Sequence, residues 1–328
     1  MSGAVRVLAL VGAVALASAA GLASAARLGG TAQAVQDAAG GFPRTVEHAL
    51  GSTEIPAEPV RIVALDQTFV DAAFALDTPI VGFTEIPGSG SELPEYLGEA
   101  RATLGRDAES VGPLDDLNVE RVAALRPDLI LSARIRHEEL YDTLSQIAPT
   151  VFSETTGPTW KDNIRLLAQA VGKEELAEQR ISDYEQRALA IGDGIRAELG
   201  RNPTISLIRF LPTETRLYQK ASFSGIVLAD TGLARPPSQD VDEFAVPISE
   251  ERIPDADADY IFVTVTEGGE SAQVSERFRA NPLWGTLTGE VHEVSDAVWG
   301  LSVGLQGAHA LLDDLARVFG VDPARAAQ

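Results

Sequence analysis

Two arginines close together at the end of a predicted strand could bind an oxygen-rich ligand. Arg134 and Arg136 follow the apolar run at residues 128–132, and side chains two positions apart on an extended chain point the same way. The carboxyl ends of parallel strands face the ligand crevice of an α/β protein. A guanidinium group offers paired donors to carboxylates or other anions without losing a proton. We therefore predict that Arg134 and Arg136 bind ligand; the ordinary alternative is two solvated surface arginines.

A third arginine ends a similar apolar run later in the chain. Arg209 lies near the end of the predicted strand at residues 204–210. If the two apolar runs belong to two lobes, this position matches that of Arg134 and Arg136 on the other side of a cleft. An ion pair with Glu214 or another acid is the alternative to a ligand-binding role. Tyr218 and Phe223 could supply an apolar wall and one hydroxyl donor, although core packing explains them nearly as well. We place Arg209, Tyr218 and Phe223 in the predicted site.

An acidic residue, Asp66, ends another predicted strand beside Gln67 and Thr68. Its carboxylate could act at a site, but it also stands where the helix that begins at Phe69 needs an N-cap. Capping is the simpler explanation, so Asp66 and Thr68 stay outside the predicted site.

The sequence offers neither a catalytic constellation nor a metal-binding motif. Cysteine is absent, which excludes disulfides, thiolate ligands and cysteine nucleophiles. The histidines show no ligand spacing such as HxxxH, and there is no Ser/His/Asp signature, phosphate-binding loop or dinucleotide motif. The four histidines are His48, His137, His292 and His309. We therefore expect a binding protein without catalytic residues, resident metal or cofactor.

One long amphipathic segment is predicted to organise the whole chain. From Lys173 to Leu199 the apolar residues recur every three or four positions, and most other positions are charged or polar. Gly172 before it, and Gly200 with Asn202-Pro203 after it, give it clear ends. A helix of this length is roughly 40 Å long. It is either an ordinary element of an α/β domain or a strut that joins two lobes.

The segments on both sides of this helix alternate short apolar runs with helical patterns. Such alternation predicts two α/β lobes, each with a mainly parallel central sheet, joined by one long α-helix. The first lobe spans residues 42–158, the linking helix region 159–200 and the second lobe 201–328. The predicted strands are 45–56 (an edge strand), 60–65, 79–83, 128–132, 149–152, 204–210, 217–218, 259–265 and 289–294, and the predicted helical segments are 69–76, 117–125, 138–147, 161–171, 173–199, 223–230, 250–253, 281–287 and 305–319. A cleft between the lobes is the default place for a ligand.

The N-terminal residues have the features of an export signal. Residues 1–26 are small and apolar with a single charge, and Ala23-Ser24-Ala25 resembles a cleavage site; residues 27–41 resemble a flexible leader. An uncleaved anchor is the alternative to a signal peptide.

The net charge of −22 argues against nucleic acid or an anionic membrane as partner. We expect the protein outside the cytoplasm, secreted, periplasmic or anchored by an uncleaved N-terminal segment, and the absence of cysteine excludes a lipid anchor attached through that residue.

Several short stretches, taken in order, resemble the periplasmic-type binding proteins of ABC importers for ferric siderophores. The matching stretches are residues 48–51, 55–56, 59–66, 117–130, 144–151 and 160–163, followed by 222–225 and 230–236 in the second half. The resemblance covers about residues 43–320 and is to the group whose two lobes are joined by a single long helix. From Arg136 to Trp160 it is greatest to the branch that takes hydroxamate or citrate-hydroxamate siderophores.

The resemblance implies roles for three further residues. Trp299 resembles an aromatic residue that lines the cleft, with domain-boundary packing as the alternative. Glu120 and Glu251 resemble acidic residues, one on each lobe, that meet arginines of the membrane permease. Glu250 is the alternative to Glu251, and compensation of a helix dipole is the ordinary explanation for both sites. The implied ligand carries its own iron, and the implied protein is a monomer with an ABC permease as partner.

Other functions stay open. The same fold could carry haem or cobalamin, although haem capture usually requires an axial tyrosine or histidine. An extracytoplasmic enzyme on a similar scaffold is a different class, and the sequence lacks its catalytic residues. A sensor that presents ligand to a membrane receptor would have the same sequence features as a transporter.

In the siderophore-binding case the lobes should close little, because a helical strut resists bending; this expectation rests on the resemblance.

Overall fold

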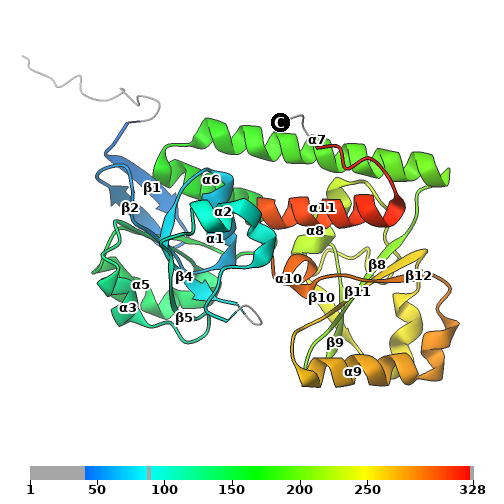
Figure 1. The fold of residues 1–328 in the computed structure, drawn as a ribbon. Helices are drawn as coiled ribbons and strands as arrows, with labels where there is room; N and C mark the ends of the chain where they lie inside the picture. The colour runs from blue at the N-terminus through cyan, green and yellow to red at the C-terminus, as the bar shows by residue number, and fades with distance from the viewer. Residues whose placement is uncertain (1–40, 87–89, 326–328) are drawn as a thin grey trace, which may run out of the picture. The chain divides into compact units, whose positions relative to one another are not determined.

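The computed structural model describes residues 41–86 and 90–325, which contain two separate five-stranded sheets (Figure 1). The predicted signal peptide, and the leader up to residue 40, lie outside the described residues. Within the described ranges, no helix combines the length and apolar character needed to cross a membrane. The first sheet has the strand order β5-β4-β3-β6-β7, and all its pairings are parallel. Its strands are β3 (Ile62–Ala64), β4 (Ile80–Glu85), β5 (Glu109–Pro113), β6 (Leu129–Ala133) and β7 (Thr150–Ser153).

The strands of the first sheet alternate their side chains between two apolar layers. Ile62 and Ala64 face one core cluster, whereas Val63 and Leu65 face another on the opposite side. A sheet covered on both faces needs apolar residues at nearly every strand position, which explains the continuous apolar runs in the sequence. The helices α1 (Gln67–Ala75) and α6 (Trp160–Val171) cover the first face, and α3 (Val119–Ala124) and α5 (Tyr141–Ser145) cover the second.

The second sheet is mixed rather than mainly parallel. Its order is β10-β9-β8-β11-β12, in which β8, β11 and β12 are parallel while β9 and β10 pair in antiparallel fashion. The link between β8 and β9 is only residues 211–214, and such a short connection joins antiparallel neighbours. The elements are β8 (Ile205–Phe210), β9 (Thr215–Tyr218), α8 (Phe223–Asp230), β10 (Ala245–Ile248), the 3₁₀ helix η3 (Glu250–Ala256), β11 (Tyr260–Val265), α9 (Gly269–Ala280), the 3₁₀ helix η4 (Pro282–Thr286), β12 (Glu290–Glu293), α10 (Asp296–Trp299) and α11 (Leu305–Phe319).

The helix α7 (Glu174–Leu199) links the two lobes, as predicted, and ends at Gly200 in the left-handed conformation (Figure 1). At its start, Lys173 donates a hydrogen bond from Nζ to the carbonyl oxygen of Leu76 at 2.6 Å. Further along, Gly192 lies so close to Thr231 that an added Cβ would meet the carbonyl oxygen of Thr231 at 1.8 Å. The buried stripe of the helix is Ala177, Ile181, Tyr184, Ala188, Ile191 and Ile195, which belongs to a core cluster shared by both lobes.

Several elements differ from the sequence prediction. A hairpin of β1 (Arg44–His48) and β2 (Gly51–Ile55) replaces the predicted edge strand, and the predicted helix at 138–147 starts earlier and is broken. Its pieces are α4 (Arg134–His137), the 3₁₀ helix η2 (Glu138–Leu140) and α5. The sequence does not indicate β5, β10, α9, the 3₁₀ helix η1 (Glu95–Leu97) or α2 (Gly98–Thr103), since these segments are short or largely polar. The helix predicted at 281–287 is present as the 3₁₀ helix η4.

Candidate ligand-binding site

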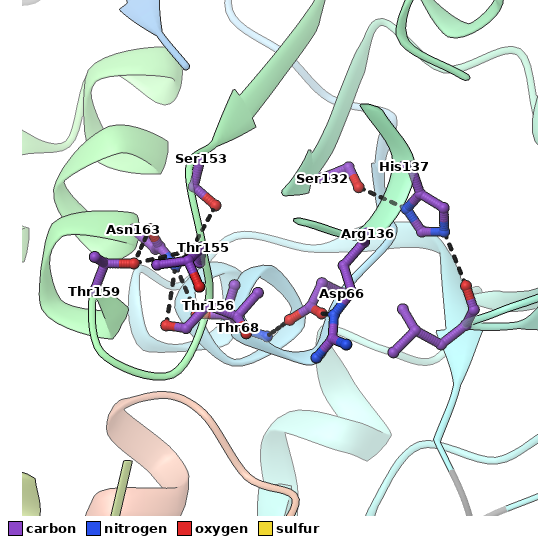
Figure 2. Close-up of polar contacts among 11 residues, drawn as sticks. Asp66, Thr68, Ser132, Arg136, His137, Ser153, Thr155, Thr156, Thr159 and Asn163 are labelled. Carbon is purple, nitrogen blue, oxygen red and sulfur yellow. Dashed lines mark hydrogen bonds and ion pairs between the residues drawn. The ribbon is translucent and has the colours of Figure 1, made fainter. Parts of the chain in front are cut away.

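The carboxyl ends of β3 and β6 bring Asp66 and Arg136 together (Figure 2). The Nε group of Arg136 donates to Oδ2 of Asp66 at 2.9 Å. The other oxygen of this carboxylate, Oδ1, accepts a hydrogen bond from the backbone N–H of Thr68 at 2.8 Å and caps α1, as the sequence suggests. The side chain of Asp66 is 2% exposed and that of Arg136 is 35% exposed. The cap residue is therefore also the partner of a predicted ligand-binding arginine.

A buried histidine fixes the short helix that carries Arg136. Nδ1 of His137 lies 2.7 Å from Oγ of Ser132, and its Nε2 lies 2.9 Å from the carbonyl oxygen of Leu114 (Figure 2). The carbonyl can only accept, so Nε2 carries the proton and Nδ1 accepts from the serine hydroxyl. Burial lowers the pKa of His137, which favours this neutral form. The pair ties α4 to the end of β6 and to the loop after β5.

A second polar network braces the end of β7. Asn163 of α6 donates from Nδ2 to the carbonyl oxygen of Thr155 at 3.0 Å and lies 3.3 Å from Oγ1 of Thr68 (Figure 2). The hydroxyl of Thr159 also donates to the carbonyl oxygen of Thr155, at 2.9 Å. These contacts join the loop after β7 to α1, so the ends of β3, β6 and β7 are linked by one largely buried polar network.

Arg134 and Arg136 do not point the same way, which corrects the geometric basis of their prediction. Both lie in α4, and on a helix residues two apart do not face each other. Arg134 instead donates from Nε to Glu138 at 3.1 Å and from Nη1 to Glu154 at 3.2 Å, on an exposed surface. The extended-chain assumption is wrong here because the helix begins directly at the end of β6.

In the second lobe, Arg209 forms a buried ion pair with Asp296. Its Nε and Nη2 groups donate to the two carboxylate oxygens at 2.7 and 2.8 Å, and Nη1 donates to the hydroxyl of Tyr218 at 2.8 Å. The side chains of Arg209 and Asp296 are 8% and 5% exposed. The ion-pair alternative given for Arg209, with Glu214 or another acid, is met by another acid, because Glu214 pairs with Arg216. The true partner lies 87 residues away in the chain.

The predicted aromatic residues of the second lobe are buried. Trp299 stacks on Phe262 with ring centroids 4.6 Å apart, and its Nε1 donates to Asp314 at 2.9 Å. Phe223 packs edge-on against Trp160 with a centroid distance of 5.9 Å. Trp299 is 1% exposed and Phe223 is 5% exposed, so a ligand could reach either ring only if neighbouring side chains moved.

A cavity of about 680 Å³ lies between residues of the two lobes. The first lobe contributes Tyr96 and Arg101 to its lining, and the second lobe contributes Asp296 with its neighbours Ser295, Ala297, Val298 and Leu301 but not Trp299. Glu92, Glu95 and Glu267 also line it, and Arg101 is ion-paired with Glu92. Asp296 thus joins the cavity to Arg209, whereas Arg134 and Arg136 are not among its lining residues.

Sequence reasoning missed Tyr96 and Asp296 as parts of this region. The hydroxyl of Tyr96 accepts a hydrogen bond from Nε2 of Gln67 at 2.8 Å, and burial together with the charge of Asp71 raises its pKa. Asp296 follows β12 at its carboxyl end, and that position could have indicated it. Tyr96 lies in a segment without strand or helix periodicity, so the sequence carries no comparable signal for it.

The two predicted docking glutamates are exposed in the first turns of helices on different lobes. Glu120 is in the first turn of α3 and Glu251 in the first turn of η3. Glu250, the alternative position, accepts hydrogen bonds from Arg277 at 2.9 Å and Asn281 at 3.0 Å. A hydrogen bond from Ser249 lowers the pKa of Glu251, which keeps it ionised. Glu251 is therefore better placed than Glu250 for contact with a partner.

Comparison with known proteins identifies several relatives along most of the chain. The family described as periplasmic binding protein matches residues 62–289. A protein named probable siderophore-binding lipoprotein YfiY, from Bacillus subtilis, is 37% identical over 84% of this chain and 87% of its own length. The achromobactin-binding periplasmic protein of Dickeya dadantii is 30% identical over 80% of this chain and 87% of its own length.

Among solved structures, SirA of Staphylococcus aureus in complex with staphyloferrin B has a similar fold. The TM-score is 0.77 and the sequence identity 28%, over 85% of this chain and 99% of SirA. This match includes both lobes and the linking helix.

Proposed function

Because the chain belongs to the periplasmic binding protein family, we propose that it captures a ferric siderophore between its lobes and delivers it to an ABC permease. The family to which the sequence shows a resemblance is confirmed. Its members are binding proteins rather than enzymes. The relatives named for siderophore and achromobactin binding, and the SirA complex with staphyloferrin B, support a siderophore as ligand. The ligand supplies its own iron, so the protein requires no cofactor.

The charge around the predicted arginines supports a hydroxamate ligand over a catecholate one, whereas the citrate-hydroxamate class, whose ferric complexes are anionic, rests on the resemblance in the sequence. Arg134, Arg136 and Arg209 each have a carboxylate partner among the described residues. A ferric trihydroxamate is uncharged because its ligand anions neutralise the ferric ion, whereas a ferric triscatecholate is a polyanion. Compensated arginines offer hydrogen-bond donors without a strongly positive field, which suits ligands of low charge. This pairing is the observation that carries the ligand class.

No contact in the described residues favours haem as a second candidate. Tyr218, the tyrosine nearest to Arg209, is 3% exposed, and its hydroxyl accepts a hydrogen bond from Arg209. An axial ligand would need that oxygen to be free to reach iron.

We propose that Glu120 and Glu251 dock the two lobes on the permease. We also propose that the protein acts as a monomer outside the cytoplasm, where it is secreted, periplasmic or held by an uncleaved N-terminal segment. Both are exposed acids on opposite lobes, and such pairs orient a complex more than they add affinity.

Tryptophan fluorescence titration tests the proposal. The purified protein is titrated with a ferric trihydroxamate, a ferric citrate-hydroxamate, a ferric catecholate, haemin and cobalamin. We expect saturable quenching by one of the first two, weakened by Arg136→Ala. Failure of every ferric siderophore, together with saturable binding of haemin or cobalamin, would show that the fold carries a different ligand.

A further inference from the structure

We propose that Asp66 is a positioning residue, which holds the guanidinium of Arg136 by its Nε edge so that both Nη groups face the ligand. The inference rests on the proposed function, because it takes the bound siderophore as the acceptor for Arg136. It gives Asp66 a role in binding beyond its role as a helix cap.

The two oxygens of Asp66 have separate partners. Oδ1 is held by the backbone N–H of Thr68 at 2.8 Å, and Oδ2 accepts from Nε of Arg136 at 2.9 Å. Because the carboxylate is buried and tied to the start of α1, it cannot follow the arginine; the arginine is oriented by it. A charge-assisted hydrogen bond of this kind is stronger than a neutral one.

The remaining donors of Arg136 are available. A guanidinium has five N–H donors, of which the Nε–H is used here. Neither Nη group hydrogen-bonds to another described residue, and Figure 2 shows them pointing beyond the ends of the nearby strands. Two adjacent Nη groups match the spacing of oxygens in a carboxylate or a chelating group.

The backbone of Arg136 is fixed as well as its guanidinium. The next residue, His137, contacts Ser132 at 2.7 Å and the carbonyl oxygen of Leu114 at 2.9 Å. The arginine is thus held at its root through His137 and at its Nε through Asp66. A donor fixed at both ends loses less conformational freedom when ligand binds.

The other two predicted arginines lack this combination. Arg209 uses Nε and both Nη groups on its own lobe and is 8% exposed, so a ligand would have to displace its partners. Arg134 bridges Glu138 and Glu154 on an exposed surface, where ion pairs hold side chains weakly. Arg136 is therefore the arginine prepared for a ligand.

A double-mutant cycle tests the assignment. Asp66→Asn keeps a good N-cap residue of the same size but removes the charge that holds Arg136. Ferrioxamine B, a trihydroxamate, and ferric aerobactin, a citrate-hydroxamate, serve as probes for the wild type, Asp66→Asn, Arg136→Gln and the double variant. We expect Asp66→Asn to weaken siderophore binding about tenfold in the wild-type background. Because residues of one hydrogen-bond network have non-additive effects, the same substitution should have almost no further effect when Arg136 is already glutamine.

The control is Asp128→Asn, which makes the same change in the same lobe. Asp128 accepts backbone hydrogen bonds from Val60 and Arg61 at 2.9 and 2.8 Å, before β6 rather than after β3. Affinity should be unchanged in this variant. Equal weakening by Asp66→Asn in the presence and absence of Arg136, or no weakening at all, would overturn the positioning role.

A measurement without ligand separates this inference from the proposed function. In ¹⁵N NMR spectra the Nε–H signal of Arg136, assigned by its loss in Arg136→Lys, should exchange slowly with water in the wild type and rapidly in Asp66→Asn. An unchanged exchange rate would overturn the positioning role even if siderophores bind. If the exchange rate changes but the wild type binds neither probe, the positioning geometry stands and the proposed ligand class is wrong.

Discussion

Asp71 and Gly307 join the first lobe to the final helix through a buried hydrogen bond. Oδ2 of Asp71 accepts from the N–H of Gly307 at 3.0 Å, and Oδ1 accepts from the N–H of Gln306 at 2.8 Å. The cap position itself is Gly304, which has no side chain to offer, and an added Cβ there would lie 2.3 Å from the carboxyl carbon of Asp71. A side chain of α1 thus satisfies the free N–H groups at the start of α11.

This link should make stability depend on pH. Burial raises the pKa of Asp71 from 3.8 to about 7, opposed in part by its backbone hydrogen bonds. A carboxyl whose pKa is raised by folding contributes stability that is fully present below its unfolded pKa and is lost as the pH rises through its folded pKa. We expect the free energy of unfolding of the wild type, measured with urea, to fall more steeply between pH 3.8 and about 7 than that of Asp71→Asn. A wild-type slope in Asp71→Asn would contradict the assignment.

The close contact between Gly192 and Thr231 predicts that α7 does not tolerate a methyl group at Gly192, whereas it should tolerate one at Gly194. Because a Cβ at Gly192 would meet the carbonyl oxygen of Thr231 at 1.8 Å, Gly192→Ala should destabilise the protein by about 1–3 kcal/mol or more. At Gly194 a Cβ would lie 3.5 Å from Val321, an ordinary contact. Gly194→Ala should therefore stabilise the protein by up to about 1 kcal/mol through helix propensity. Urea unfolding of the two variants measures both effects, and equal changes would refute the close approach.

The buried pair of Arg209 and Asp296 should be costly to break. Asp296→Ala leaves a buried guanidinium without its carboxylate, and we expect a loss of about 3–5 kcal/mol in the free energy of unfolding. Asp255→Ala removes the partner of Arg252 in an exposed pair and should cost at most about 1 kcal/mol. If the two substitutions lower the free energy of unfolding equally, Asp296 does not hold Arg209 as their contacts indicate.

Docking on a permease should be separable from ligand capture. Glu120→Lys and Glu251→Lys reverse exposed charges on different lobes, so each should lower siderophore uptake by cells about tenfold while the dissociation constant of the purified protein stays unchanged. Glu198→Lys makes the same charge change at an exposed position of α7 and should leave uptake unaffected. Uptake that survives both reversals would exclude these glutamates from docking.

Local patterns in the sequence determined the long helix and the parallel first lobe. The repeat of apolar residues from Lys173 to Leu199 indicates α7 to within one residue, because helix packing requires an apolar stripe with this period. Phe223–Asp230 is likewise predicted with its observed bounds, and in the structure the side chain of Ser222 caps it by accepting a hydrogen bond from the N–H of Gly225. Segments with little periodicity, such as α9 and β10, were beyond this reasoning because tertiary contacts stabilise them.

Only the tertiary structure decided how the predicted arginines are used. Asp66 and Arg136 are 70 residues apart, and Arg209 and Asp296 are 87 apart, so no local pattern links the members of either pair. The direction of Arg134 and Arg136 depended on whether the chain after β6 continues extended or turns at once into α4. Residue type determines which chemistry a side chain can perform, whereas its partner, its burial and its free donors are set by which strand ends the fold brings together.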